Sequence, residues 1–257
     1  MTALLQVADL SKSFGGVHAV RGVSFDVPKG IIFALIGPNG AGKSTLVNLL
    51  TGALRPSGGS VALGGRTITG WAPHRIAAVG MARTFQNGRL FARLSVLDNV
   101  MVGASRRSSS SVADILIRSA RFRRNEAAAR EASGAALRRL DLEHLVAEEA
   151  TSLPYGQQRM IEISRALVLQ PSLLILDEPA AGLNSSEVEK FVNVLDGLRR
   201  DGLTIILIEH NMKLVMRIAD RIAVVNFGEK IAEGTPEQVR RNPSVLEAYL
   251  GKGTAHA

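Results

Sequence analysis

Short apolar runs recur along the chain and alternate, in its second half, with amphipathic stretches. The runs that predict β-strands cover residues 4–10, 23–27, 31–36, 60–63, 173–176, 204–208 and 222–225. Apolar positions at helical spacing predict helices over residues 185–200 and 212–219, between the later strands. Strands that alternate with helices form parallel sheets, so the pattern predicts an α/β core.

A different pattern, helical and rich in arginine and alanine, covers residues 87–152. We interpret it as a helical insert in the α/β core. Its arginines, concentrated in residues 106–139, either face anionic lipid or form a solvated helix face. After the last predicted strand, Pro236 and Pro243 stand where proline fits the first turn of a helix, which predicts a small helical cap at the end.

The composition narrows the class of protein. The 257 residues are enough for one domain with an elaborated subdomain, and no apolar run reaches the roughly 18 residues that cross a bilayer. The first residues lack the apolar stretch of a secretory signal, so we expect a soluble, cytoplasmic chain that could be peripheral to a membrane. The absence of cysteine excludes disulfides and thiol nucleophiles, and it leaves oxygen or histidine as metal ligands. The net charge of +8 fits an anionic ligand or membrane surface, while 4% aromatic residues offer little for stacking on nucleic acid bases.

A glycine-rich loop, which we call the P-loop, directly follows the apolar run 31–36 and precedes a helical run. Its residues are Gly37, Pro38, Asn39, Gly40, Ala41, Gly42, Lys43, Ser44 and Thr45, and they match G-x-x-x-x-G-K-[ST]. In such a loop the backbone N–H groups surround phosphate oxygens, and the helix N-terminus adds a favourable dipole. Lys43 would neutralise the β and γ phosphates, and Ser44 would offer its hydroxyl to Mg²⁺. The loop therefore predicts a site for Mg-ATP.

Further along, polar residues end two apolar strands. Asp177 and Glu178 follow the run 173–176, and adjacent carboxylates near a core are costly unless a cation is present. Asp177 would hold Mg²⁺ through water, and Glu178 would act as the general base for the attacking water. His210 follows the run 204–208 and either reaches the γ-phosphate or is a hydrogen-bonded structural residue. The Gln86 amide either contacts Mg²⁺ and the attacking water or only closes a loop.

The order of these motifs resembles that of the ATP-binding subunits of ABC transporters over essentially the whole chain. The motif that completes the resemblance is Leu153-Pro154-Tyr155-Gly156-Gln157-Gln158-Arg159, which we call the signature loop. The resemblance implies a P-loop NTPase (RecA-like) α/β fold, with a parallel-sheet core, an antiparallel β subdomain and a helical insert that carries the signature. It implies one ABC ATPase domain over residues 1–257: a catalytic core at 1–86 and 160–233, a helical signature subdomain at 87–159 and a C-terminal helical cap at 234–257.

The resemblance also assigns roles to single residues. Phe14 matches the aromatic residue that stacks on adenine, although core packing is an equally open interpretation. The other matches are Gln86 to the Q-loop, Asp177 and Glu178 to the Walker B pair, His210 to the switch histidine, Asn184 to the D-loop, and Tyr155, Gly156 and Gln157 to the residues that contact the ATP of a partner subunit.

Two departures from the family pattern affect the predicted contact with the partner. Pro154 and Tyr155 stand where the signature usually has serine and glycine, and Asn184 stands where the D-loop usually has aspartate. Loss of the serine hydroxyl removes one hydrogen-bond donor to the partner's γ-phosphate. We expect the backbone N–H of Gly156 and the dipole of the following helix to remain available, so that the contact is weakened but kept.

The chain resembles the ATPases of branched-chain amino acid importers at residues 155–159, 177–184 and 208–212 and in its ending at 234–251. Related importers of urea or other amides share these features. The resemblance implies an ATPase at the cytoplasmic face of the inner membrane, peripheral, with a second ATPase subunit, identical or related, two permease subunits and, indirectly, a periplasmic solute-binding protein. An exporter of lipid or lipopolysaccharide is the alternative, and no nucleic acid partner is expected. Leu90, Phe91, Leu94, Val96 and Leu97 either accept a permease helix or form the core of the insert.

Overall fold

The computed structural model describes residues 3–84, 90–104, 114, 117 and 119–250. Contacts within the chain define two compact units. The first, which we call the sheet unit, comprises Met1–Arg83, Ser172–Pro179 and Leu195–Ala257. The second, the helical unit, comprises Thr84–Pro171 and Ala180–Val194.

A six-stranded sheet forms the centre of the sheet unit. Its strands are β3 (Ile32–Ile36), β6 (Met81–Arg83), β7 (Leu173–Asp177), β8 (Thr204–Ile208), β9 (Arg221–Asn226) and β10 (Glu229–Gly234), in the order β10-β9-β3-β8-β7-β6. All neighbours are parallel except β10, which pairs antiparallel with β9. Every residue of β3, β7 and β8 is buried, as expected of parallel strands with both faces covered. The predicted parallel α/β core is confirmed.

The two faces of this sheet pack against different partners. Phe33 and Leu35 of β3 contribute to a hydrophobic core shared with helix α1 (Lys43–Leu50) and with a second, antiparallel sheet. The strands of that sheet are β1 (Ala3–Phe14), β2 (Val17–Pro28), β4 (Gly58–Leu63) and β5 (Arg66–Thr67), in the order β2-β1-β4-β5. The intervening residues Ala34 and Ile36 belong to a second core, because successive side chains of a strand point to opposite faces.

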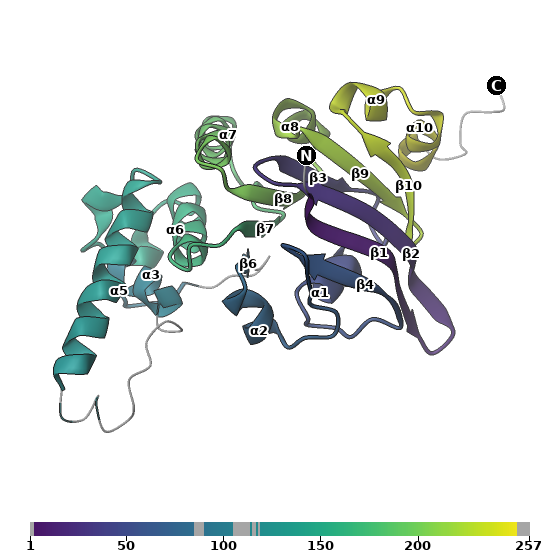
Figure 1. Cartoon of the computed structure of the whole chain (residues 1–257). Helices are drawn as coiled ribbons and strands as arrows, with labels where there is room; N and C mark the ends of the chain where they lie inside the picture. Colours follow the sequence, from purple (N-terminus) through teal and green to yellow (C-terminus); the bar gives the residue numbers. More distant parts are fainter. Residues whose placement is uncertain (1–2, 85–89, 105–113, 115–116, 118, 251–257) are drawn as a thin grey trace. The chain divides into compact units, whose positions relative to one another are not determined.

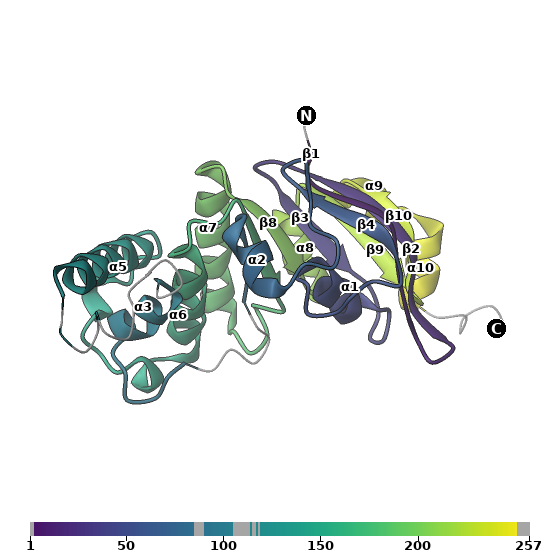
Figure 2. The same cartoon turned by 60° about the horizontal axis from the view of Figure 1, so that its bottom comes forward.

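Helices cover the second face. They are α8 (Met212–Ile218), α9 (Pro236–Arg240) and α10 (Pro243–Leu250), and Val215, Val239 and Val245 are their buried contributions to the second core. Figures 1 and 2 show α9 and α10 beside β9 and β10, and Figure 1 shows α8 next to α9. Helix α9 begins with a capping box in which Thr235 and Gln238 exchange hydrogen bonds, and proline occupies its first turn. A short helix, α2 (Pro73–Ala78), precedes β6.

The helical unit contains α3 (Val96–Ala104), α5 (Ala120–Arg138), the 3₁₀ turns η2 (Glu143–Leu145) and η3 (Ala150–Ser152), α6 (Tyr155–Leu167) and the start of α7 (Ser185–Arg200). Buried Val96, Val100, Leu137 and Ile161 lie on α3, α5 and α6. The whole of α6 belongs to this unit, so the expected boundary at residue 160 falls inside a helix. Among the described residues, no helix has both the length and the apolar character needed to cross a bilayer.

Candidate nucleotide-binding site

The P-loop connects the end of β3 to the start of α1, and its shape depends on glycine. Gly37 approaches the neighbouring strand so closely that a Cβ atom there would lie 2.0 Å from the carbonyl oxygen of Val225. Gly42, with φ +100°, would place a Cβ 2.5 Å from the carbonyl oxygen of Ala19. Only residues without a side chain fit these two positions, so the loop is held close to β2 and β9.

Lys43 is 8% exposed, and its ammonium group lies over its own loop. The Nζ atom donates hydrogen bonds to the carbonyl oxygens of Gly37, at 2.7 Å, and Pro38, at 2.8 Å. Burial lowers the pKa of Lys43, and the negative charges of Glu178 and Asp177 partly oppose that effect. Lys43, the predicted ligand of the phosphates, is thus a nearly buried cation that interacts electrostatically with the carboxylates of Glu178 and Asp177.

An open cavity of about 460 Å³ lies beside the P-loop in the sheet unit. Its lining includes Val17, His18, Ala19 and Arg21 of β2, Asn39 to Thr45 of the loop, Glu178, Ile208, Phe227 and Gly228. The predicted base Glu178, the predicted phosphate ligand Lys43 and the predicted Mg²⁺ ligand Ser44 therefore face the same space. The hairpin turn at Gly228 is fixed to the loop, because its N–H donates to the carbonyl oxygen of Ala41 at 2.9 Å.

Asp177 is 5% exposed and has a cationic partner that the sequence analysis did not identify. Its Oδ2 atom accepts a hydrogen bond from Arg83 Nη2 at 2.8 Å, and Arg83 Nη1 donates to Asn48 Oδ1 of α1 at 2.7 Å. The same guanidinium therefore connects the end of β7 to the helix that follows the P-loop. A buried carboxylate at the end of a strand signals the need for a cation, but the pattern alone did not distinguish a metal ion from an arginine.

The oxygen atoms of Asp177 and of Ser44 are the hard ligands that Mg²⁺ prefers, so the residues present fit that ion. Gln86, the third predicted metal contact and a predicted catalytic residue, lies outside the described residues. Its role stays a prediction.

Glu178 and His210 follow neighbouring strands and lie close together. The Glu178 Oε1 and His210 Nδ1 atoms are 3.9 Å apart, and the two side chains are 25% and 59% exposed. Glu178 has φ 47°, and its N–H donates to the carbonyl oxygen of Ile208 at 2.9 Å, which fixes its position at the end of β7. A non-glycine residue with positive φ is uncommon and is concentrated at functional sites.

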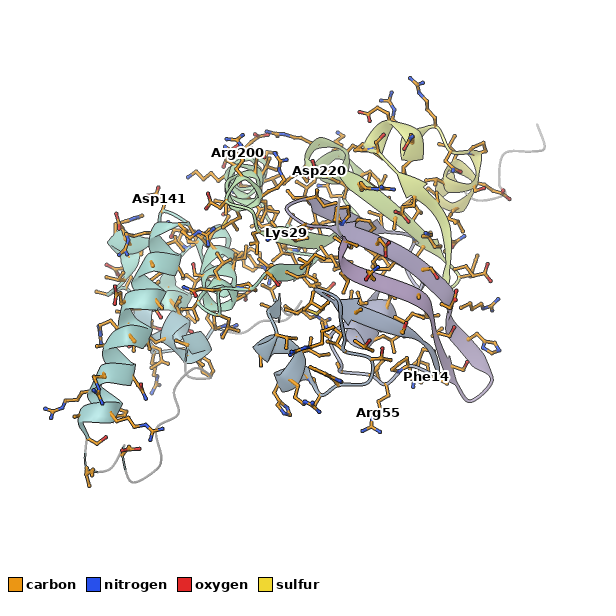
Figure 3. The ribbon with its side chains drawn as sticks, in the orientation of Figure 1. Phe14, Lys29, Arg55, Asp141, Arg200 and Asp220 are labelled. Atoms are coloured by element: carbon orange, nitrogen blue, oxygen red, sulfur yellow. The ribbon has the colours of Figure 1, made fainter. Side chains whose placement is uncertain are left out.

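Phe14 lies at the end of β1 and is 47% exposed (Figure 3). The ammonium group of Lys12 stands 5.0 Å from the centre of its ring, and Lys12 also donates to the carbonyl oxygen of Arg55 at 2.9 Å. A half-exposed ring is not a core residue, so the core interpretation of Phe14 is not supported. A contact with adenine stays a proposal.

The signature loop leads into α6, with Pro154 before its first turn and Tyr155, Gly156 and Gln157 within that turn. The Gly156 N–H donates to Glu187 Oε1 at 3.2 Å. We expected the Gly156 N–H to be available for a phosphate. That expectation is wrong for this conformation, because a carboxylate of the same chain already accepts the hydrogen bond of this N–H. Tyr155 is 43% exposed, and the Arg159 guanidinium stands 5.0 Å from the centre of its ring.

Asn184 precedes α7 and forms a capping box with Glu187. Asn184 Oδ1 accepts from the Glu187 N–H at 3.0 Å, and Glu187 Oε2 accepts from the Asn184 N–H at 2.9 Å. Asparagine is among the residues preferred at this position, so the departure from aspartate preserves the cap. The spacing of Asn184 and Glu187 could have revealed the capping box, but not the additional contact of Glu187 with Gly156.

The apolar residues that follow Gln86 were expected either to accept a permease helix or to form the core of the insert. The structure supports a different interpretation for different residues. Val96 is fully buried in the core of the helical unit, whereas Phe91 and Leu94 are 47% and 37% exposed. The buried side chain of Asn99 holds this turn: its Nδ2 group donates to the carbonyl oxygens of Phe91, Leu94 and Ser95, and its Oδ1 accepts from the Phe91 N–H. Asn99 thereby fixes Phe91 and Leu94 on the surface.

Comparison with known proteins gives the relatives of the chain. A family model described as ABC transporter matches residues 20–181, and one described as branched-chain amino acid ATP-binding cassette transporter matches residues 229–255. The chain is 44% identical over 250 residues to the high-affinity branched-chain amino acid transport ATP-binding proteins BraF of Pseudomonas aeruginosa and LivG of Escherichia coli K12, which covers 97% of this chain and 98% of each relative. A crystal structure of the ADP conformation of an ATP-binding cassette of an ABC transporter is similar with a TM-score of 0.86 at 33% identity, covering 98% of this chain and 100% of that one. The chain belongs to the ABC transporter family, among its ATP-binding cassettes.

Proposed function

We propose that the chain is the ATP-hydrolysing motor subunit of an ABC importer and that the importer carries branched-chain amino acids. The observation that carries this proposal is the shared cavity of the sheet unit, which brings Lys43, Ser44 and Glu178 together. BraF and LivG, relatives at 44% identity over nearly the whole chain, are named as branched-chain amino acid transport proteins, which supports the choice of solute.

In this proposal the phosphates of ATP replace two carbonyl oxygens as the partners of Lys43. The phosphates lie over the P-loop, where backbone N–H groups and the N-terminus of α1 favour negative charge. Asp177, Ser44 and Gln86 would hold Mg²⁺, which would withdraw charge from the β and γ phosphates. Phe14 contacts the adenine ring.

Glu178 performs the proton transfer of the proposed reaction. It accepts a proton from a water molecule whose oxygen attacks the γ-phosphorus, while the bond from that phosphorus to the β–γ bridging oxygen breaks. ADP and inorganic phosphate are the products. His210, 3.9 Å from Glu178, would donate a hydrogen bond to the γ-phosphate and help position the attacking water.

The P-loop would supply half of each hydrolytic site, and a second cassette would supply the other half. Tyr155, Gly156, Gln157 and Asn184 of that subunit, a second copy or a related chain, would contact the γ-phosphate and the attacking water. Two ATP molecules would then lie between two subunits that close on ATP and separate after hydrolysis. Because ATP binds the closed state better than the open one, that difference in affinity can move an attached protein.

Two permease subunits are the proposed recipients of this motion, with a solute-binding protein acting on their other side. Phe91 and Leu94, half-exposed apolar side chains on a turn fixed by Asn99, are the proposed contact for a permease helix. Such a contact would keep the chain at the cytoplasmic face of the membrane as a peripheral subunit.

The hydrolytic role is tested by ATP binding and turnover of purified Glu178→Gln. We expect this variant to bind ATP as the wild type does and to lose turnover by at least about 100-fold, a typical contribution of general base catalysis. Glu229→Gln, an exposed carboxylate on β10, is the matched control and should keep full activity. Wild-type turnover in Glu178→Gln would refute the assigned base.

The solute is tested by uptake in host cells from which the chain has been deleted. We expect uptake of radiolabelled leucine to be lost, and to be restored by the wild-type chain but not by Glu178→Gln. Loss of urea uptake with normal leucine uptake would instead identify the amide alternative. If the deletion leaves the uptake of both solutes unchanged, the importer proposal is wrong.

A further inference from the structure

The N-terminus of α6 carries an anionic partner supplied by another helix of the same unit. Glu187 of α7 places its Oε1 atom 3.2 Å from the backbone nitrogen of Gly156. A Cβ atom on Gly156 would lie 2.6 Å from that oxygen, so the carboxylate is packed directly against the backbone of the signature loop. The first N–H groups of a helix have no partner within the helix, and a negative charge there is stabilising.

The second carboxylate oxygen holds Glu187 in this orientation. Oε2 accepts the hydrogen bond of the Asn184 N–H at 2.9 Å, and Asn184 Oδ1 accepts that of the Glu187 N–H at 3.0 Å. One side chain therefore connects the signature loop to the start of α7. Gly156 and Glu187 also line a cavity of about 610 Å³ in the helical unit, which leaves room for Oε1 to move away from the glycine.

We propose that Glu187 takes the place of the γ-phosphate while no nucleotide is bound by the signature loop. The inference rests on the proposed function, in which the Gly156 N–H contacts the ATP of a partner subunit. One backbone N–H cannot serve both anions, so an arriving phosphate must displace Glu187 Oε1. The carboxylate therefore raises the ATP concentration needed for closure, and after phosphate release it returns and favours separation of the subunits.

The displacement also couples two loops. When Oε1 leaves Gly156, Oε2 still accepts the hydrogen bond from Asn184, so the side chain must reorient while the cap of α7 persists. A phosphate that arrives at the signature loop thereby moves the side chain that binds Asn184, a residue that contacts the same partner ATP in the proposed function. Glu187 acts as a positioning residue, since it touches neither substrate nor product.

The test compares variants in the Glu178→Gln background, where bound ATP is not hydrolysed. Sedimentation velocity over a series of Mg-ATP concentrations gives the midpoint for dimer formation. Glu187→Gln is the informative variant, because glutamine also forms capping boxes and therefore preserves the start of α7 while removing the charge. We expect its midpoint to fall about tenfold, as for loss of one competing charge-assisted hydrogen bond.

Glu189→Gln, on the exposed side of the same helix, is the matched control and should leave the midpoint unchanged. The rate of dimer separation after removal of ATP is a second measurement and should decrease in Glu187→Gln. A midpoint that is unchanged or raised in Glu187→Gln overturns the inference and leaves the proposed function intact. Absence of an ATP-dependent dimer in the Glu178→Gln parent overturns a site shared by two copies of this chain, and the inference with it.

Discussion

Lys43 is nearly buried, and two carbonyl oxygens of its own loop accept its hydrogen bonds. Desolvation lowers its pKa, so part of its affinity for protons is lost in the nucleotide-free protein. Bound phosphates would bring negative charge to the ammonium group and raise that pKa again. The protonation of Lys43 and the binding of ATP are therefore linked.

This linkage predicts that ATP binding takes up protons at alkaline pH. Between the lowered pKa of free Lys43 and its raised pKa with ATP, the bound form carries more protons, so affinity should decrease as pH rises. Calorimetric titration of Glu178→Gln with ATP, in two buffers of different ionisation enthalpy, measures the uptake. The same titration at neutral pH is the comparison and should show a smaller contribution from Lys43. Proton release at alkaline pH would contradict the account.

The ion pair between Arg83 and Asp177 leads to a second prediction at the residue scale, which concerns the stability of the fold. Arg83→Ala should lower the free energy of unfolding by about 3 kcal/mol, because it leaves the nearly buried Asp177 carboxylate without this ion pair. Arg21→Ala, which removes a pair at 3.6 Å from the half-exposed Glu229, should cost less than about 1 kcal/mol. Urea unfolding followed by circular dichroism compares the two variants. Equal effects would show that Arg83 does not compensate Asp177.

The residue scale also shows where sequence reasoning succeeds. The P-loop, Asp177 and Glu178 are predicted well because the motif and the neighbouring strand fix their positions locally. Arg83 and Glu187 were missed because their partners, Asp177 and Gly156, are distant along the chain and meet them only in the folded structure. The Gly156 N–H illustrates the limit: the sequence places it at a helix N-terminus but does not reveal which anion it binds.

At the scale of elements, apolar runs identified the strands that lie inside a sheet and missed two strands at its edges. β6 has only three residues, and β10 is largely polar because it lies at the edge, paired only to β9. Neither contains the continuous apolar run that marks a strand covered on both faces. The α5 helix was predicted as part of an insert, but its bounds were not, because runs of alanine carry little periodicity.

The hydrogen bonds of Asn99 lead to a prediction about the stability of one element, the turn before α3. Asn99→Ala removes the two N–H groups that three carbonyl oxygens share and one accepted bond, at a fully buried position, so the helical unit should lose roughly 2–3 kcal/mol of stability. Hydrogen exchange of the amides of residues 91–104 measures the change. Asp98→Ala, at an exposed position of the same helix, is the control and should have a smaller effect. Unchanged protection in Asn99→Ala would show that Asn99 does not hold the turn.

At the scale of the whole molecule, the predicted active residues are divided between two units. Lys43, Glu178 and His210 belong to the sheet unit, while the signature loop and Asn184 belong to the helical unit. In the proposed function each unit serves a different ATP molecule, so no chain completes a hydrolytic site with its own signature loop.

Mixing two inactive variants tests whether the base and the signature loop of one ATP site come from different subunits. Glu178→Gln lacks the base, and Gly156→Asp adds a side chain whose Cβ would lie 2.6 Å from the Glu187 carboxylate and places a negative charge where the partner's phosphate should bind. We expect each variant alone to bind ATP without turnover. In a mixed dimer, Glu178 of one subunit faces an intact signature loop of the other, so ATPase activity should return on mixing. A mixture as inactive as its components would contradict a site whose base and signature loop come from two copies of this chain.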